Sequence, residues 1–172
     1  MTAIEKQPVI GVDIGGVLIA HSDDRSDTSF FSKHYLKTPA CDGAFEAIRQ
    51  LVSAGCDVHL VSKCGETVEG KSRKWLLTNR FYEITGLTPE KVHFCRERAD
   101  KAAICTDLGA THFVDDRLEV LSYLHDVPNK YLFNPNPKEV SKFKAVLNSV
   151  QKVSTWEQLL PLILVSELVA ER

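Results

Sequence analysis

The sequence lacks any apolar run long enough to cross a membrane. Its most apolar late stretch, residues 159–165, contains Pro161 and is far shorter than the ~20 residues that a membrane-spanning helix needs. The first residues, Met1–Pro8, also lack the basic start and apolar centre of a secretory signal. We therefore expect a cytoplasmic protein with no membrane partner.

Paired cysteines and a strong net charge are also missing. The five cysteines are an odd number, are widely scattered and form no CxxC pair, which favours free thiols over disulfides or a zinc site. The net charge of −2 gives no strong signal for nucleic-acid binding. With 172 residues, of which 44% are hydrophobic and 26% charged, the chain has the size and composition of one globular domain, expected to span residues 1–172.

Short apolar runs alternate with longer amphipathic segments along the whole chain. The apolar runs predict strands at residues 9–13, 58–62, 92–95, 112–115 and 131–133. The other segments predict helices near residues 43–54, 67–79, 99–108, 118–124, 137–149 and 155–169. Strands separated by helices indicate a parallel sheet that is covered on both faces. The predicted fold class is therefore α/β, with three layers.

One connection is longer than an ordinary loop. Residues 20–41 contain a polar stretch at 21–27, followed by Phe30, Phe31 and the pair Tyr35-Leu36. Connections of this length in compact domains are usually functional lids or mobile segments. Because this one leaves directly after the first predicted strand, we expect it to overhang the end of that strand as a flap or minimal cap. A disordered surface excursion is the alternative.

The first predicted strand ends on a carboxylate, Asp13, and the chain then turns through Gly15 and Gly16. A carboxylate delivered to such a turn keeps its oxygens free and lets a ligand approach the backbone, as in phosphate and metal sites. An Asp that only completes a turn through local hydrogen bonds is the structural alternative.

Polar side chains also follow the other predicted strands. The carboxyl ends of parallel strands meet at one edge of a sheet, where ligands bind. The residues at these ends are Asp13, Ser62 with Lys63, Arg96, and Asp115-Asp116-Arg117. Two acidic positions with a hydroxyl and nearby cations suit a phosphoryl group bound together with Mg²⁺. Lys101 opens a predicted helix, where a cation is unfavourable for the helix dipole but can pair with these carboxylates.

Together these residues resemble the haloacid dehalogenase superfamily of phosphohydrolases, which use an aspartate nucleophile. The resemblance covers residues 9–133 and rests on four elements: the DxxGV pattern at Asp13, Ser62, Lys101, and the FVDD sequence that ends at Asp116. It implies a Rossmann-like sheet of five parallel strands in the order 5-4-1-2-3. It also implies a capless or minimal-cap site, because residues 20–41 are too few for a large helical cap.

The resemblance further implies a Mg²⁺-dependent reaction on a phosphorylated small molecule or nucleotide. The implied catalytic residues are Asp13 as the nucleophile, Ser62 and Lys101. The implied phosphate-binding residues are Ser62, Lys63, Lys101 and Gly16, and the implied metal ligands are Asp13, the backbone carbonyl of Gly15, Asp115 and Asp116. The last predicted helix, apolar on most sides, either covers the sheet edge or forms a homodimer contact.

Gly15 departs from the phosphatase pattern of this superfamily, which has a second Asp two residues after the nucleophile as general acid and base. Loss of general acid-base catalysis costs roughly 10²–10⁴ in rate, so we expect weak activity. His21, Asp23 or Asp24 in the long insert is a candidate replacement. A catalytically poor regulatory module that binds phosphate and metal is the alternative function.

A third interpretation concerns the glycine turn alone. Residues 11–16 also resemble the first phosphate loop of sugar kinases of the actin and hexokinase type. Those kinases have Thr or Ser after the glycines, where this chain has Val17, and an antiparallel hairpin follows.

Overall fold

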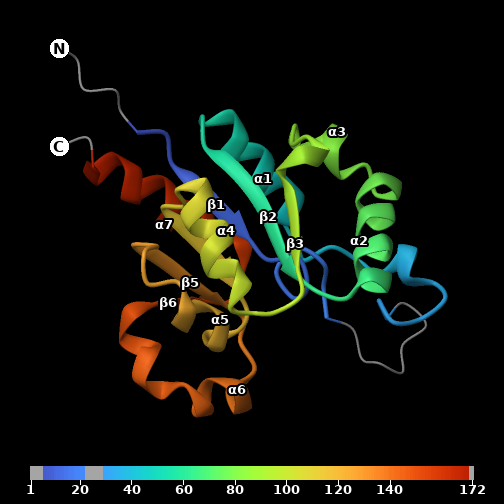
Figure 1. The fold of residues 1–172 in the computed structure, drawn as a ribbon. Helices are drawn as coiled ribbons and strands as arrows, with labels where there is room; N and C mark the ends of the chain where they lie inside the picture. The colour runs from blue at the N-terminus through green and yellow to red at the C-terminus, as the bar shows by residue number, and fades with distance from the viewer. Residues whose placement is uncertain (1–5, 22–28, 171–172) are drawn as a thin grey trace.

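A parallel sheet of six strands forms the centre of the protein. The computed structural model describes residues 6–21 and 29–170. The strands are β1 (Val9–Val12), β2 (Asp57–Lys63), β3 (Val92–Cys95), β4 (His112–Asp115), β5 (Asn129–Phe133) and β6 (Gln151–Val153). They lie in the order β3-β2-β1-β4-β5-β6, and every neighbouring pair is parallel. β1 therefore lies inside the sheet between β2 and β4, and Figure 1 shows it beside β2.

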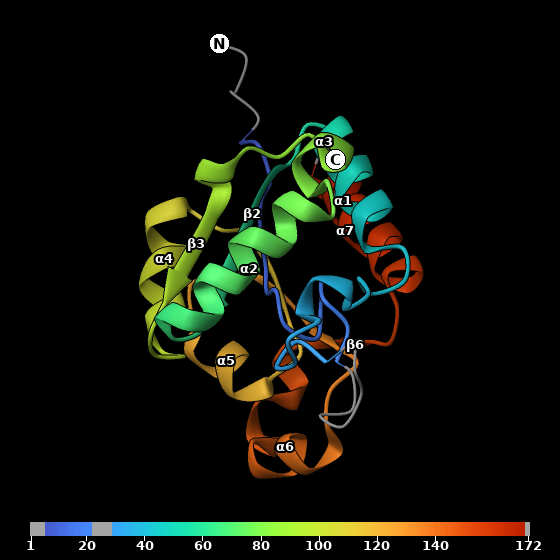
Figure 2. The ribbon, with the colours of Figure 1, turned by 90° about the vertical axis from the view of Figure 1, so that its right-hand side faces the viewer.

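Helices cover both faces of this sheet and make the three predicted layers (Figure 2). One face carries α1 (Ala44–Ser53), α2 (Glu66–Thr78), α3 (Phe81–Thr85) and α7 (Trp156–Ala170). The other carries α4 (Asp100–Leu108), α5 (Leu118–Tyr123) and α6 (Pro137–Lys142). Three short 3-10 helices complete the structure at Tyr35–Lys37, Pro89–Lys91 and Lys144–Ser149. The predicted α/β class and three-layer arrangement are confirmed.

The continuous apolar character of β1 follows from burial on both sides. Ile10 and Val12 point into the core beneath α1 and α7, whereas Val9 joins the core beneath α4 and α5. Gly11 lies under the ring of Phe113, and a Cβ at this position would overlap that ring. The strand can therefore approach its neighbour closely only because residue 11 has no side chain.

The structure corrects three details of the prediction. The sheet has six strands instead of five, because Gln151–Val153 adds to the outer edge beside β5. Two residues of this short edge strand are exposed and polar, so it carries no apolar pattern. The sequence also missed α3, and the helix predicted at 137–149 breaks into α6 and a 3-10 helix.

The kinase interpretation is wrong. It requires an antiparallel hairpin after the first strand, but β1 pairs with β2 in parallel after an intervening helix.

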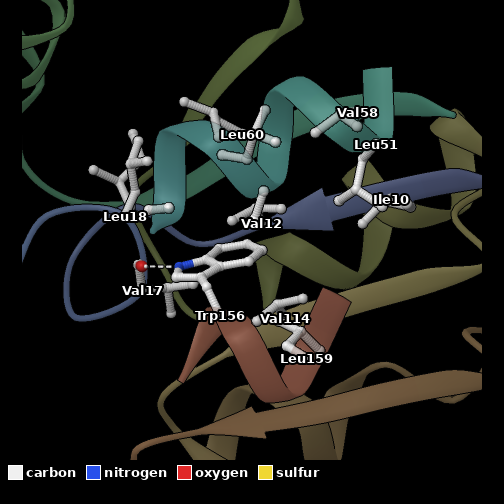
Figure 3. Packing of buried hydrophobic residues seen from close by; sticks show 14 of the residues in the cluster. Ile10, Val12, Val17, Leu18, Leu51, Val58, Leu60, Val114, Trp156 and Leu159 are labelled. Carbon is white, nitrogen blue, oxygen red and sulfur yellow. Dashed lines mark hydrogen bonds between the residues drawn. The ribbon is translucent and has the colours of Figure 1, made fainter. Parts of the chain in front are cut away.

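Two tryptophans anchor the chain that leaves β1. Trp156, at the start of α7, donates a hydrogen bond of 2.8 Å from Nε1 to the backbone oxygen of Val17 (Figure 3). Trp75 in α2 donates one of 2.9 Å to the backbone oxygen of Thr38. The two ends of the segment between these anchors lie side by side, because the Ala20 amide donates a hydrogen bond to the backbone oxygen of Pro39. Both ends of the long insert are therefore held against the body of the protein.

Two further expectations concern the chain as a whole. All five cysteines are free thiols, as predicted. Within the described ranges, no helix combines the length and apolar character needed to cross a bilayer.

Candidate active site

The candidate site lies where β1, β2 and β4 end. Asp13 directly follows β1, Asp115 is the last residue of β4, and Lys101 lies in the first turn of α4. Lys101 donates from Nζ to Asp13 Oδ1 at 3.0 Å and to Asp115 Oδ2 at 2.8 Å. The second oxygen of Asp115 accepts a 2.9 Å hydrogen bond from the Arg117 amide. The two carboxylates that the sequence placed on neighbouring strands are therefore joined by one ammonium group.

All three charged groups in this arrangement are buried. The exposed fractions are 7% for Asp13, 2% for Lys101 and 0% for Asp115. Burial raises the pKa of Asp13 to about 6 and outweighs the opposing effect of Lys101, and Asp116 raises it further. Burial also raises the pKa of Asp115 to about 6, with Asp13 adding to the effect. Burial lowers the pKa of Lys101, but the two carboxylates outweigh it and raise that pKa above its usual value.

A third carboxylate completes an acidic cluster. Oxygens of Asp13, Asp115 and Asp116 all lie within 4.8 Å of one another. Such a set of hard oxygen donors fits Mg²⁺, which takes carboxylate ligands and retains several waters. A divalent cation would also offset the concentrated negative charge that raises the pKa values of the two buried carboxylates. The residues present therefore fit the metal that the sequence predicted.

The two glycines after Asp13 have different environments. Gly15 is exposed, lies outside the positive-φ region, and a Cβ there would meet nothing within 4 Å. Gly16 has φ +79°, and a Cβ there would overlap His21 and Asp116. The Gly16 amide donates to the Ile19 oxygen at 2.8 Å, so a phosphate contact there would require this turn to open. The backbone conformation and the packing therefore require glycine at residue 16 but not at residue 15.

A cavity of about 340 Å³ opens directly over Asp13. Its lining includes Gly15, Ser62, Lys63 and Lys101, together with the three carboxylates of the acidic cluster. Phe30 and Phe31 of the long insert also line it. His21, at the start of the insert, is 2.9 Å from Asp116 Oδ2 through Nε2, and this hydrogen bond raises the pKa of the imidazole. Asp23 and Asp24 lie outside the described residues.

The arginine that the sequence singled out after β3 does not reach the cavity, whereas one that the sequence did not single out does. Arg96, which directly follows β3, donates to the Cys64 oxygen and pairs with Glu69, and it does not line the cavity. Arg98, two residues later, does line it, as does Arg117. The only sequence signal for Arg98 is its position one helical turn before Lys101.

The architecture matches that of known solved structures. A D,D-heptose 1,7-bisphosphate phosphatase from B. bronchiseptica, complexed with magnesium and phosphate, has a TM-score of 0.69 and 15% identity over 93% of this chain and 99% of its own. A haloacid dehalogenase-like family hydrolase from Xanthomonas campestris has a TM-score of 0.61 and 11% identity, covering 96% and 98%. The chain has the haloacid dehalogenase fold.

A third solved structure with this fold is the cobalt-bound deoxy-D-mannose-octulosonate 8-phosphate phosphatase from Haemophilus influenzae. Its TM-score is 0.57, with 14% identity over 94% of this chain and 89% of its own. No protein-family model and no curated protein matches the sequence. The haloacid dehalogenase fold that the resemblance implied is thus confirmed by architecture at low sequence identity.

Proposed function

We propose that this chain belongs to the haloacid dehalogenase superfamily and is a magnesium-dependent phosphohydrolase acting on a phosphomonoester. The observation that carries the proposal is the arrangement of Asp13 and Asp115, which are buried at adjacent strand ends, joined by Lys101 and open to one cavity. Similarity to solved phosphatases of this fold supports it. The substrate is a phosphorylated small molecule or nucleotide.

In this proposal Asp13 is the nucleophile. One of its oxygens attacks phosphorus in line, the bond to the leaving oxygen breaks, and water later cleaves the aspartyl-phosphate to release phosphate. Lys101 holds the carboxylate in place and neutralises charge on the phosphoryl oxygens, and Ser62 and Lys63 hold those oxygens from the end of β2. The amide of Gly16 would join them only once the turn that it closes with the Ile19 oxygen has opened.

The metal would be held by Asp13, Asp115 and Asp116 with the backbone carbonyl of Gly15. A bound Mg²⁺ ion supplies positive charge to the phosphoryl group and the attacking carboxylate. The other groups proposed to contact the phosphoryl oxygens are the side chains of Ser62, Lys63 and Lys101.

Proton transfer to the leaving group needs a donor, because residue 15 has no side chain. We propose that His21 supplies it, since its imidazole borders the cavity and its raised pKa favours the protonated form. The hydrogen bond to Asp116 would orient the ring. A His21→Ala variant should then lose turnover but keep magnesium binding, and unchanged turnover would remove His21 from the mechanism.

The proposed function is tested with a panel of phosphomonoesters assayed with and without magnesium. We expect turnover that requires the metal and is absent in Asp13→Asn, which keeps the size of the side chain but removes the nucleophile. Rapid acid quench should trap phosphate covalently on Asp13 in the wild type. Turnover that survives in Asp13→Asn would contradict the assignment of the nucleophile.

A catalytically poor binding module is the second candidate, and Gly15 is the observation that favours it. Such a module keeps the acidic cluster and Lys101 but lacks a group for proton transfer at residue 15. It predicts that the protein binds magnesium with phosphate and turns over none of the panel.

We propose that residues 1–172 act as one domain, that residues 20–41 form the flap over the site, and that the protein works in the cytoplasm. Leu162 and Val165 of α7 are exposed, which supports a homodimer contact there. Sedimentation of the wild type beside Val165→Glu tests the dimer.

A further inference from the structure

A second cavity, of about 410 Å³, adjoins the candidate active site. We call it the cationic cavity, because its lining includes Arg98, Arg117, Lys138 and Lys142. Arg98 and Arg117 also line the cavity over Asp13. The two arginines therefore form a wall common to both spaces, and a ligand that leaves the active site past them enters the cationic cavity.

The two acidic residues of the cationic cavity already have partners. Glu119 Oε2 lies 3.1 Å from Arg98 Nη1. The carboxylate of Glu139 accepts hydrogen bonds of 3.0 and 2.8 Å from the amides of Leu118 and Glu119, at the start of α5. These contacts satisfy both carboxylates within the protein. They leave the other cations of the cavity to be neutralised from outside.

Arg117 is the most informative of those cations. Its Nε is buried and has no hydrogen-bond partner among the described residues. Within the same part of the chain, no carboxylate forms an ion pair with Arg117, Lys138 or Lys142. A buried donor without an acceptor is costly and rare, so it indicates a position where a ligand supplies the acceptor.

Lys138 and Lys142 add charge on the far side of the same space. They lie four residues apart on α6, so both side chains leave the same face of the helix. Asn136 accepts from the Lys138 amide at 2.9 Å and fixes the start of α6. The lysines are therefore held by a capped helix that packs on α5, next to the end of β4.

We propose that the substrate carries a second phosphate on its leaving group, and that this phosphate binds in the cationic cavity. This inference rests on the proposed function, because it assigns the reacting phosphate to the site at Asp13. Arg117 and Arg98 contact the second phosphate where the two cavities meet, and Lys138 and Lys142 neutralise its remaining charge. A dianionic phosphate matches this set better than a carboxylate, which carries one charge and two acceptor oxygens.

The test compares substrates that differ only by the second phosphate. Suitable pairs are fructose 6-phosphate with fructose 1,6-bisphosphate, and AMP with adenosine 3′,5′-bisphosphate. We expect kcat/KM to be about 10- to 100-fold higher for the bisphosphate of at least one pair, as charge-assisted hydrogen bonds to phosphate provide. The preference should fall as ionic strength rises.

Paired variants assign this preference to the cationic cavity. The double variant Lys138→Met/Lys142→Met and the single variant Arg117→Met should each reduce the ratio of bisphosphate to monophosphate kcat/KM by about tenfold or more. Lys144→Met is the matched control, because it removes one exposed lysine from the neighbouring 3-10 helix outside both cavities. Equal kcat/KM within each pair, or a preference that survives in both cavity variants, overturns the inference.

Equilibrium binding separates failure of this inference from failure of the proposed function. Titration of the Asp13→Asn protein with each member of the pairs, in the presence of magnesium, should show about tenfold tighter binding of the bisphosphate. If nothing is turned over but this difference appears and is lost in the cavity variants, the second phosphate site stands and the hydrolase does not. If p-nitrophenyl phosphate is hydrolysed but the bisphosphates bind no more tightly, only the second phosphate site is refuted. Tight binding of a short single-stranded nucleic acid in place of both pairs also refutes it.

Discussion

Restoring a carboxylate at residue 15 is the sharpest perturbation that the structure offers. A Cβ at Gly15 meets no atom within 4 Å, and the backbone there lies outside the region that only glycine adopts readily. Gly15→Asp should therefore fold without strain, with its carboxylate in the cavity over Asp13. The neighbouring acidic cluster disfavours a further negative charge, which raises the pKa of the new carboxyl and suits it to act as an acid.

The gain is measured in a His21→Ala background, where the proposed proton donor is absent, and its expected size follows from general acid-base catalysis. A positioned acid contributes about 10²–10⁴ in rate, equivalent to about 3–5 kcal/mol of barrier. The gain should be larger for an alkyl phosphate such as β-glycerol phosphate than for p-nitrophenyl phosphate, because the alkoxide is the poorer leaving group and needs the proton more. The assay is kcat/KM for both substrates with saturating magnesium.

Gly15→Asn is the matched control, because it fills the same space without a transferable proton. An equal gain in Gly15→Asn would show that packing, and not acid catalysis, changed the rate. A Gly15→Asp protein that folds, binds magnesium and gains less than about threefold on the alkyl phosphate would refute the reasoning. That outcome would mean that a group other than His21 and residue 15 transfers the proton, or that the site does not support the reaction.

Three further predictions concern stability. Lys101→Met leaves two buried carboxylates without their common cation and should cost about 3–5 kcal/mol in the free energy of unfolding, measured by urea titration without metal beside an exposed-lysine control. Trp156→Phe keeps most of the buried ring but leaves the Val17 oxygen without its donor, so we expect a loss of about 1–3 kcal/mol, and no measurable loss would contradict the anchoring role. Burial lowers the pKa of His112 to about 4, so the unfolded chain takes up this proton first as pH falls below 6.5. His112 should therefore reduce stability by about 2 kcal/mol between pH 7 and pH 5, a fall that His112→Gln should not share.

The sequence was sufficient to predict the order of the elements. Apolar runs and amphipathic segments alternate so regularly that every strand from β1 to β5 was located within two residues at each end. The sequence did not predict the elements that are too short to show a periodic pattern. β6 has three residues with one buried side chain, and α3 has five residues and follows closely on the longer helix α2. Both are held by tertiary packing, which overrides weak local preference.

The approach of Asp13 to Asp115 could also be predicted, because parallel strand ends must meet at one edge. The resemblance to a known superfamily then gave Lys101 and Ser62 their expected roles. Which arginine enters the site could not be predicted in this way. Arg96 and Arg98 lie two residues apart in a connection with no regular periodicity, so only the packed loop decides which side chain reaches the cavity.

The sequence by itself determined the chemistry available at this site: an aspartate at a glycine turn, two more carboxylates on a neighbouring strand, and a glycine where an acid is expected. Only the tertiary structure decided how those groups are arranged. It buried Lys101 between two carboxylates, left open space beside Gly15, and joined the active site to a cationic cavity through Arg98 and Arg117. The physical reason is that strand positions follow from local periodicity, whereas contacts between distant side chains depend on how the helices and loops pack around the sheet.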